Sequence, residues 1–172
     1  PAPGLLNEHL KDLESANNKK TVVWGREYHM RKLKNIFNPI TGKINQNNYN
    51  INYPLTNIQL NEKLIFDDFN NLIEQAEITE KYKDIEFFLE NYINNYEFNS
   101  LQWLTMRVGN QSFSQKLLDK IGGIDTSFDP SGWYMDLELG LRLKEVNADF
   151  KLNKNAIMIH LSHERNLDSL FD

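Results

Sequence analysis

Two polar residues of this sequence stand where chemical groups are often presented. Asp136 follows an aromatic turn and opens a stretch with helical spacing, so its carboxylate is expected at a helix N-terminus, where the helix dipole stabilises an anion. His160 ends a short apolar run that begins at Ala156, and a strand there would hold its imidazole in one direction. A carboxylate can accept a proton as a general base, and an imidazole is a common metal ligand.

Each of these residues also has a purely structural interpretation. Asp136 alone is explained by helix capping, and a single His at the end of an apolar strand is more often structural than a ligand. Trp133 and Tyr134 offer flat apolar faces of the kind that stack on sugar rings, but Trp133 is equally explained as a core anchor. His160 and His163 lack the spacing and the Glu of the helical zinc-protease motif.

The elements that position these residues are predicted from hydrophobic spacing and from turn residues. Leucines at helical spacing predict a helix over Leu5–Ser15. The β-branched run Thr21–Trp24 predicts a short strand that stops at Gly25. Arg31–Phe37 is expected to be a short basic helix, and Asn38–Asn61, with its Asn, Pro and Gly, is expected to be a long loop or insertion.

The rest of the chain has a clearer pattern. Its predicted elements, in chain order, are helices over Phe66–Glu77 and Glu80–Tyr96, a strand over Leu101–Val108, a helix over Phe113–Ile121, a helix over Leu137–Val146, and strands over Phe150–Leu152 and Ala156–Leu161. Gly122-Gly123 and Asn147 follow the last two helices, and these residue types suit a left-handed cap.

Bulk properties restrict the class of protein. With 172 residues, 40% of them apolar, the chain has the size and composition of one folded domain. A net charge of -5 disfavours a nucleic-acid binder, which needs a basic surface. The chain has no Cys, so disulfides and Cys-based zinc sites are excluded and any metal must be held by His and carboxylates. The absence of Cys fits a bacterial cytoplasmic protein. No apolar run is long enough to span a bilayer, and membrane association stays open.

Several short motifs lie in a fixed order in the second half of the chain. They are Gly109-Asn110, Ser112-Phe113, Gly122-Gly123-Ile124-Asp125, Phe128, Gly132-Trp133, Asp136, Leu139-Gly140-Leu141-Arg142-Leu143 and His160. In this order they resemble the C-terminal half of the family 2 inverting glycosyltransferases of the GT-A fold, and related galactosyltransferase-type domains. The resemblance is strong over about a third of the chain and rests on the combination, since no single motif is specific.

The beginning of the chain is similar to the same family. Pro1–Leu13 and Val22–Arg26 look like the segment that follows the Asp-x-Asp metal motif in these enzymes, and the 172 residues contain no Asp-x-Asp. The resemblance therefore implies a single α/β domain over 1–172: a partial, Rossmann-like GT-A fold that contains the acceptor-binding half and begins just after that motif. Residues 31–100 match nothing in the family and are expected to form an insertion with helices.

The resemblance implies transfer of a sugar from a UDP-sugar to a hydroxyl acceptor, with inversion and with Mn²⁺ or Mg²⁺. Asp136 would be the general base, and His160 would complete the coordination of the metal, which also requires the absent Asp-x-Asp half. The residues implied to contact substrates are Gly132 and Trp133 around the acceptor, Gly109 and Asn110 near the donor sugar, and Arg26. We therefore expect that this chain alone binds UDP weakly and is inactive.

One departure from the family keeps alternatives open. Met135 occupies the position of a Glu that commonly helps to bind the acceptor, so the acceptor (glycan, lipid-linked glycan, protein or peptide) is not defined. A non-catalytic transferase module that binds carbohydrate or a protein partner is one alternative. A metallohydrolase that uses His160, His163 and a carboxylate is another. A partial GT-A core would also have an exposed sheet edge, which predicts self-association.

Overall fold

The computed structural model describes residues 1–16, 20–30, 33, 35–37, 43–46, 62–92, 100–128 and 134–161. These residues form an α/β protein with six α-helices and a three-stranded mixed sheet. They belong to two compact units. Unit 1 comprises Pro1–Pro3, Glu27–Thr79 and Ile159–Asp172, and unit 2 comprises Gly4–Arg26 and Glu80–Met158.

Three strands form the main sheet: β1 (Thr21–Met30), β4 (Gln111–Ser112) and β5 (Asp149–Leu161). Their order is β4-β1-β5, and β4 is antiparallel to β1. At the first residue of β5, the backbone N–H of Asp149 donates to the carbonyl of Lys20, which directly precedes β1. The strands β1 and β5 therefore begin side by side, and the sheet is mixed.

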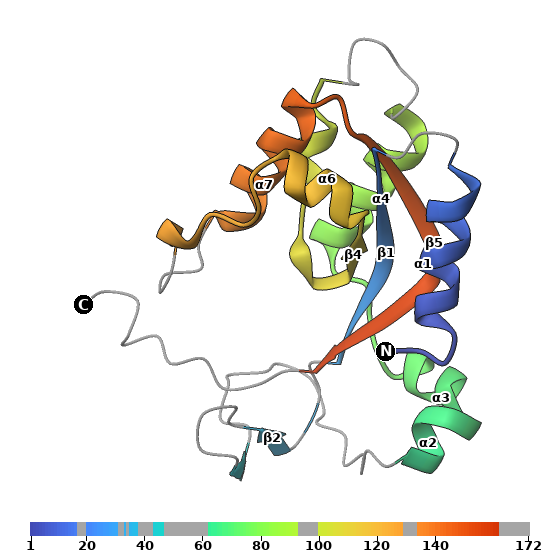
Figure 1. Ribbon diagram of the computed structural model, residues 1–172. Helices are drawn as coiled ribbons and strands as arrows, with labels where there is room; N and C mark the ends of the chain where they lie inside the picture. Colours follow the sequence, from blue (N-terminus) through green and yellow to red (C-terminus); the bar gives the residue numbers. More distant parts are fainter. Residues whose placement is uncertain are drawn as a thin grey trace. The chain divides into compact units, whose positions relative to one another are not determined.

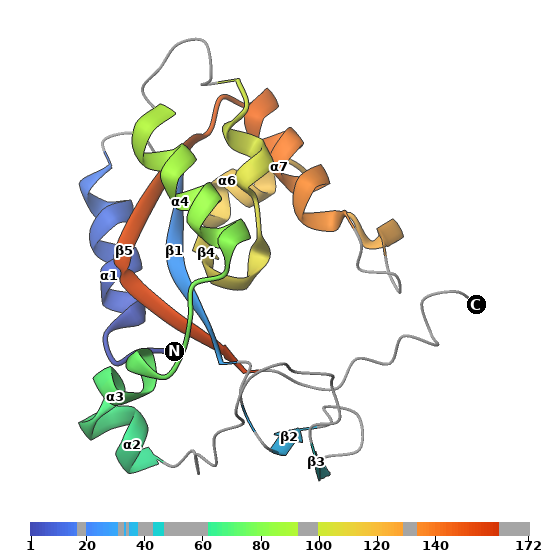
Figure 2. The same ribbon diagram turned by 180° about the vertical axis from the view of Figure 1, so that it is seen from behind.

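Part of the core of unit 2 lies between this sheet and α4 (Glu80–Tyr92). The helices α1 (Leu5–Ser15) and α4 lie on opposite faces of the sheet strands (Figure 1 and Figure 2). Val22 and Trp24 of β1 are buried together with Leu89 of α4, and the Trp24 ring is 5.8 Å from that of Tyr82. Burial of such large side chains is the main favourable term in folding.

The helix α7 (Met135–Glu145) packs on the 3₁₀ helix η1 (Gln102–Thr105) through Gly140. A Cβ on Gly140 would lie 2.5 Å from the carbonyl oxygen of Trp103 and 2.8 Å from the Cβ of Met106. Only a residue without a side chain permits this approach. The glycine in the Leu-Gly-Leu-Arg-Leu motif is thus explained by helix packing.

Two helix ends in unit 2 have the left-handed caps that the sequence predicted. Gly122 and Gly123, which follow α6 (Gln115–Lys120), have φ of 83° and 84°, and Gly123 N–H donates to the carbonyl of Leu118. Asn147, which follows α7, has φ of 57°. Glycine and asparagine tolerate this conformation best, so a local signal was sufficient here.

Unit 1 contains the remaining described elements. They are the paired strands β2 (Asn35–Phe37) and β3 (Ile44–Gln46), and the helices α2 (Glu62–Asp67) and α3 (Phe69–Glu74). Its buried apolar residues are Met30, Leu33 and Leu72. An isolated β-bridge joins His29 of β1 to Glu77, which follows α3.

Several predicted elements were wrong. The first strand does not stop at Gly25, and the two predicted C-terminal strands are a single strand, β5. Residues 101–108 contain η1 instead of a strand, because Thr105 donates its hydroxyl to the carbonyl of Gln102 and closes a tight turn. The short basic helix predicted over residues 31–37 is replaced, where the structure describes it, by the strand β2.

Some of the predicted helices are close to their observed bounds. The bounds of α1 match the prediction, and α7 begins two residues earlier than predicted. The predicted helix Phe66–Glu77 is instead α2 and α3, which Asp68 separates with φ of -142°. The last part of the helix predicted over Glu80–Tyr96 lies outside the described residues, as does most of the loop predicted over Asn38–Asn61.

The α/β class is therefore confirmed, whereas the GT-A assignment, the single domain and the insertion stay predictions. Within the described ranges, each helix is too short or too polar to cross a lipid bilayer.

Candidate functional site

Asp136 lies in the first turn of α7, as predicted, and its residue is half-buried. Tyr134 precedes the helix with φ of 66°, a left-handed conformation that is unusual for a bulky residue. Its carbonyl accepts the first hydrogen bond of the helix, from Glu138 N–H, and its side chain is 70% exposed. The helix N-terminus thus carries a carboxylate beside an exposed aromatic residue.

Three residues of the predicted site lie outside the described residues. They are Gly132 and Trp133, assigned to the acceptor, and His163, assigned to the alternative hydrolase. Their roles stay predictions.

Arg142 joins α7 to the turn that follows α6. Its guanidinium donates through Nη1 to the carbonyl oxygens of Ile121 (2.7 Å) and Gly123 (2.6 Å). It also donates through Nε and Nη2 to both oxygens of Glu138, at 2.5 and 2.7 Å. These hydrogen bonds to the Glu138 carboxylate raise the pKa of Arg142 above its ordinary value. The Gly-Gly turn and the Leu-Gly-Leu-Arg-Leu helix are therefore one connected piece.

Asp125, the last residue of the Gly-Gly-Ile-Asp motif, closes a small turn of its own. Its Oδ1 accepts a hydrogen bond of 2.9 Å from the backbone N–H of Ser127. This bond, with a further one from the Ser127 side chain, lowers the pKa of Asp125 below its ordinary value, although the carboxylate is fully exposed.

Asn110, predicted near the donor sugar, is buried and has three protein partners. Its Nδ2 donates to the carbonyl oxygens of Arg26 (3.0 Å) and Ala156 (2.9 Å), and its Oδ1 lies 3.0 Å from His9 Nε2. The Asn110 side-chain amide therefore connects α1, β1 and β5. Gly109 beside it is exposed. A contact of either residue with the donor sugar stays a prediction.

These contacts also fix the tautomer of His9. Because Nδ2 of Asn110 faces two carbonyls, its Oδ1 must face His9, so His9 Nε2 carries a proton. In the neutral ring, His9 Nδ1 then accepts from the hydroxyl of Ser112, at 2.8 Å. Sequence analysis predicted this helix from the spacing of its leucines and missed the network. The available signal was a polar residue at a position with apolar spacing.

Arg26, also predicted to contact substrate, pairs with Glu86 of α4. Its Nε and Nη2 donate to the two carboxylate oxygens, at 2.8 and 2.5 Å. The pair is largely buried, so it fastens β1 to α4, and the substrate role of Arg26 stays a prediction.

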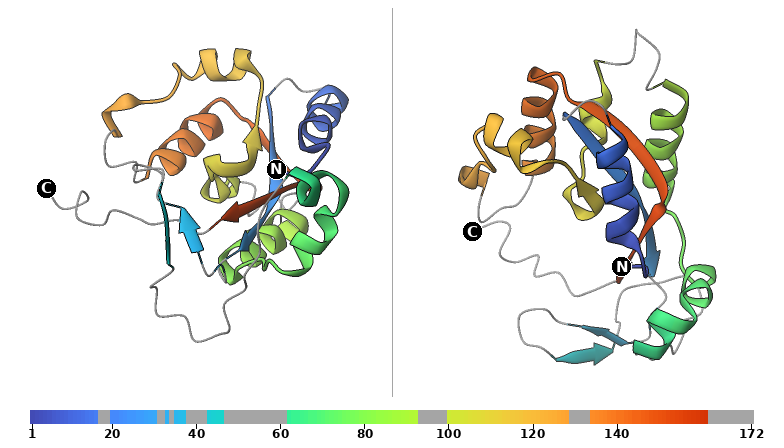
Figure 3. Two further views of the ribbon diagram at one scale, coloured as in Figure 1. Left: turned by 90° about the horizontal axis from the view of Figure 1, so that it is seen from below. Right: turned by 45° about the vertical axis from the view of Figure 1, so that its right-hand side comes forward.

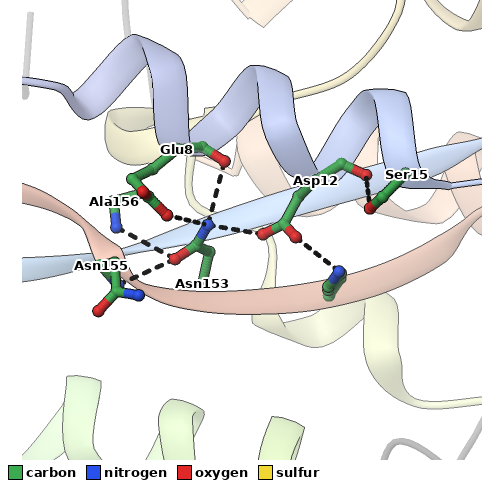
Figure 4. A network of polar contacts seen from close by, with 7 residues as sticks. Glu8, Asp12, Ser15, Asn153, Asn155 and Ala156 are labelled. Carbon is green, nitrogen blue, oxygen red and sulfur yellow. Dashed lines mark hydrogen bonds and ion pairs between the residues drawn. The ribbon is translucent and has the colours of Figure 1, made fainter.

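The helix α1 lies beside β5 (Figure 3), and a polar network attaches the two elements (Figure 4). Asn153 donates through Nδ2 to the Glu8 carbonyl (3.1 Å) and to Asp12 Oδ2 (2.6 Å), while Lys151 pairs with Asp12 at 2.6 Å. The Oδ1 of Asn153 accepts from the backbone N–H of Asn155 at 2.9 Å. All polar atoms of the buried Asn153 amide are therefore used, and the network is a structural connection.

His160 lies in unit 1, beside two residues of β1. Its Nδ1 is 4.0 Å from Oε1 of Glu27, and its ring centroid is 5.1 Å from that of His29. The same Glu27 oxygen lies 3.1 Å from Nε2 of His29. Glu27 and His29 were missed by sequence analysis. The available signal was Glu-x-His in a strand, a spacing that puts both side chains on one face.

Glu27, His29 and His160 are residue types that bind metal ions, but together they do not form a complete metal site. Within the described ranges, no three His, Asp or Glu side chains are placed to hold a metal ion. The imidazole of His160 suits Mn²⁺ as one ligand, so the remaining ligands would come from phosphate oxygens or from residues outside those ranges.

The structure gathers the predicted site residues in two places. Asp136, Asn110, Gly109 and Arg26 belong to unit 2, and His160 belongs to unit 1. A common cleft for Asp136 and His160 therefore stays a prediction. Searches with the chain against the profiles of known protein families and against curated proteins gave no match. The function is accordingly inferred from the motifs and their geometry.

Proposed function

We propose that this chain forms the acceptor-side part of an inverting, metal-dependent glycosyltransferase that transfers a sugar from a UDP-sugar to a hydroxyl acceptor. The observation that supports this proposal is the connection made by Arg142. It joins the helix that presents Asp136 to the Gly122-Gly123 turn. Two separate motifs of the resemblance thus belong to one piece of structure, with the candidate base at its helix N-terminus.

The chemistry assigned to Asp136 is general-base catalysis. Its carboxylate accepts the proton of the acceptor hydroxyl while that oxygen attacks the anomeric carbon and the bond to UDP breaks. The displacement is direct, so the anomeric configuration inverts. Asp136 lies in the first turn of α7, and the exposed ring of Tyr134 offers an apolar face for the acceptor sugar.

The metal-binding role is assigned to His160. A bound Mn²⁺ or Mg²⁺ ion would offset the negative charge of the departing diphosphate. His160 would supply one ligand nitrogen, and its partly exposed side chain is compatible with this role.

The direct test is an assay of the protein at its natural length with a panel of UDP-sugars and Mn²⁺, measuring UDP release and glycan transfer. Asp136→Asn keeps the shape of the side chain and removes the base, so kcat should fall by about 10²–10⁴-fold. The matched control is Asp119→Asn, which changes an exposed carboxylate on α6. A fall in kcat of less than twofold in Asp136→Asn contradicts the base role. Absence of turnover with every UDP-sugar contradicts the proposed function.

The non-catalytic module remains the second candidate, because Met135 opens α7 where a Glu is expected and the described residues hold no complete metal site. It predicts glycan binding that needs neither UDP-sugar nor metal and that Asp136→Asn leaves intact. A glycan array with and without EDTA separates the two candidates.

A further inference from the structure

The carboxylate of Glu27 lies beside two imidazoles at the ends of β1 and β5 in unit 1. We propose that Glu27 and His29 are positioning residues for His160: Glu27 fixes its tautomer and His29 limits the direction of its ring, so that Nε2 is its metal-binding nitrogen. This inference rests on the proposed function, in which His160 is a metal ligand. It adds two residues that neither the motifs nor the resemblance indicated.

Burial shows why Glu27 must act on its neighbours. Its side chain is 5% exposed, and a buried carboxylate is costly unless charged or hydrogen-bonded partners face it. One oxygen, Oε1, faces both imidazoles, at 3.1 Å from His29 Nε2 and 4.0 Å from His160 Nδ1. Both distances are those of ion-pair contacts.

The direction of His160 follows from this arrangement. A neutral imidazole has one protonated nitrogen and one with a lone pair. A carboxylate oxygen attracts a proton on Nδ1 and repels a lone pair there. The Nδ1–H tautomer of His160 is therefore favoured, and Nε2 carries the lone pair that a metal requires. A carboxylate behind the ligating imidazole is a common way in which proteins orient such a ligand.

His29 supplies the second constraint. Its backbone is held on both sides by Glu77: His29 N–H donates to the Glu77 carbonyl at 2.7 Å, and Glu77 N–H donates to the His29 carbonyl at 3.0 Å. The two imidazole rings are inclined by 37° with centroids 5.1 Å apart. The His29 side chain is 12% exposed and that of His160 is 36% exposed. The largely buried ring of His29 therefore limits the rotation of the His160 ring, which reaches solvent.

Glu27 is better explained as a positioning residue than as a ligand. Its oxygen is closer to His29, the more buried imidazole, than to His160. The three side chains also do not form a complete metal-ligand group. This geometry places the carboxylate behind the imidazole that a metal would contact.

The test is the tautomer of His160, measured by long-range ¹H–¹⁵N NMR on labelled protein of natural length at about pH 8, where imidazoles are neutral. The wild type should show Nδ1–H, and His160→Gln assigns the signal by removing it. Glu27→Gln, which keeps size and removes charge, should shift His160 toward Nε2–H. His29→Phe, which keeps a ring against His160, should leave it as Nδ1–H. Glu90→Gln, which changes the carboxylate that pairs with Lys154, is the control and should have no effect.

A second readout is the affinity for Mn²⁺, measured by electron paramagnetic resonance. Glu27→Gln should weaken binding by about 10–100-fold, and Glu27→Asp should recover part of it. An Nε2–H tautomer of His160 in the wild type overturns the inference even if the variants fail to fold. An affinity unchanged in folded Glu27→Gln overturns it as well.

The two proposals fail separately. In one outcome, the NMR experiment shows that the Nδ1–H tautomer of His160 depends on Glu27 while the protein turns over no UDP-sugar. That result supports the positioning role and contradicts the transferase. If turnover requires Asp136 but the His160 tautomer is unchanged in Glu27→Gln, the transferase is supported and the positioning role is contradicted.

Discussion

His9 and Asn110, which are 101 positions apart in the sequence, share a buried hydrogen bond of 3.0 Å between Nε2 and Oδ1. Because the same Asn110 amide donates to carbonyls of β1 and β5, one side chain holds three elements of unit 2 together. The resemblance placed Asn110 near the donor sugar, and its structural contacts make it a residue whose loss affects folding before it affects binding.

Asn110→Ala should therefore lower the free energy of unfolding by about 3 kcal/mol, because it leaves one buried N–H and two carbonyls without this partner. Urea denaturation followed by circular dichroism measures the change. Asn91→Ala removes an exposed amide that donates to its own helix and should change stability by less than about 0.5 kcal/mol. Equal effects of the two substitutions would contradict the buried connection.

Gly140→Ala should destabilise the protein, although alanine is intrinsically favoured in a helix by about 1 kcal/mol. The new methyl would lie 2.5 Å from the Trp103 carbonyl oxygen, so α7 must move away from η1. The expected loss is about 1–3 kcal/mol. Thermal unfolding shows whether the substitution raises or lowers the stability of the protein. An increase in Tm, as expected of an unpacked helix, would show that α7 does not contact η1 in this way.

Arg142→Lys keeps the charge and should still open the turn after α6. An ammonium cannot donate to two carbonyl oxygens and to both oxygens of Glu138 at once. Amide exchange at Gly123 should become about 10-fold faster, which corresponds to about 1.4 kcal/mol. Lys144→Arg in the same helix is the control. If Gly123 exchanges at the wild-type rate in Arg142→Lys, the connection between the two motifs is not energetically significant.

Asp125 should contribute to stability at neutral pH and lose this contribution in acid. Its pKa is lowered in the folded protein, so folding favours the ionised form. The stabilisation is present above the unfolded-state pKa and disappears as the pH falls through the folded-state value. Asp125→Asn should flatten the acid side of a profile of urea midpoint against pH. The effect should be small because the carboxylate is fully exposed, and identical profiles would contradict it.

The 172-residue chain alone should bind UDP with Mn²⁺ more weakly than micromolar. A metal diphosphate needs several oxygen or nitrogen ligands, and the described residues offer no group of three. Isothermal titration calorimetry measures this directly, with EDTA in place of Mn²⁺ as the control. Micromolar binding that EDTA abolishes would show that the chain contains a complete site.

The sequence predicted the features that depend on neighbouring residues. The bounds of α1, the glycine cap after α6 and the left-handed Asn147 follow from spacing and residue type within a few positions. The position of Asp136 at the start of α7 was predictable for the same reason.

Features that depend on distant residues were not predictable. Gly25 ended the predicted strand because glycine usually weakens one. In the structure β1 continues, and a Cβ on Gly25 would lie 2.4 Å from Nδ2 of Asn110. The pairing of Arg26 with Glu86 and of Glu27 with His29 and His160 likewise required contacts that hydrophobic spacing does not contain.

The attachment of α1 also differs from what its leucines suggested. Leu6 and Leu10 are 74% and 52% exposed, whereas His9 is buried and Asp12 bonds to β5. Apolar contact is non-directional, so a helix docked by leucines can rotate or slide at little cost. Hydrogen bonds require direction and distance together. A displacement of α1 by a single residue would break its bonds to Asn110, Ser112 and Asn153 simultaneously, so this helix has one docked register and no neighbouring alternatives.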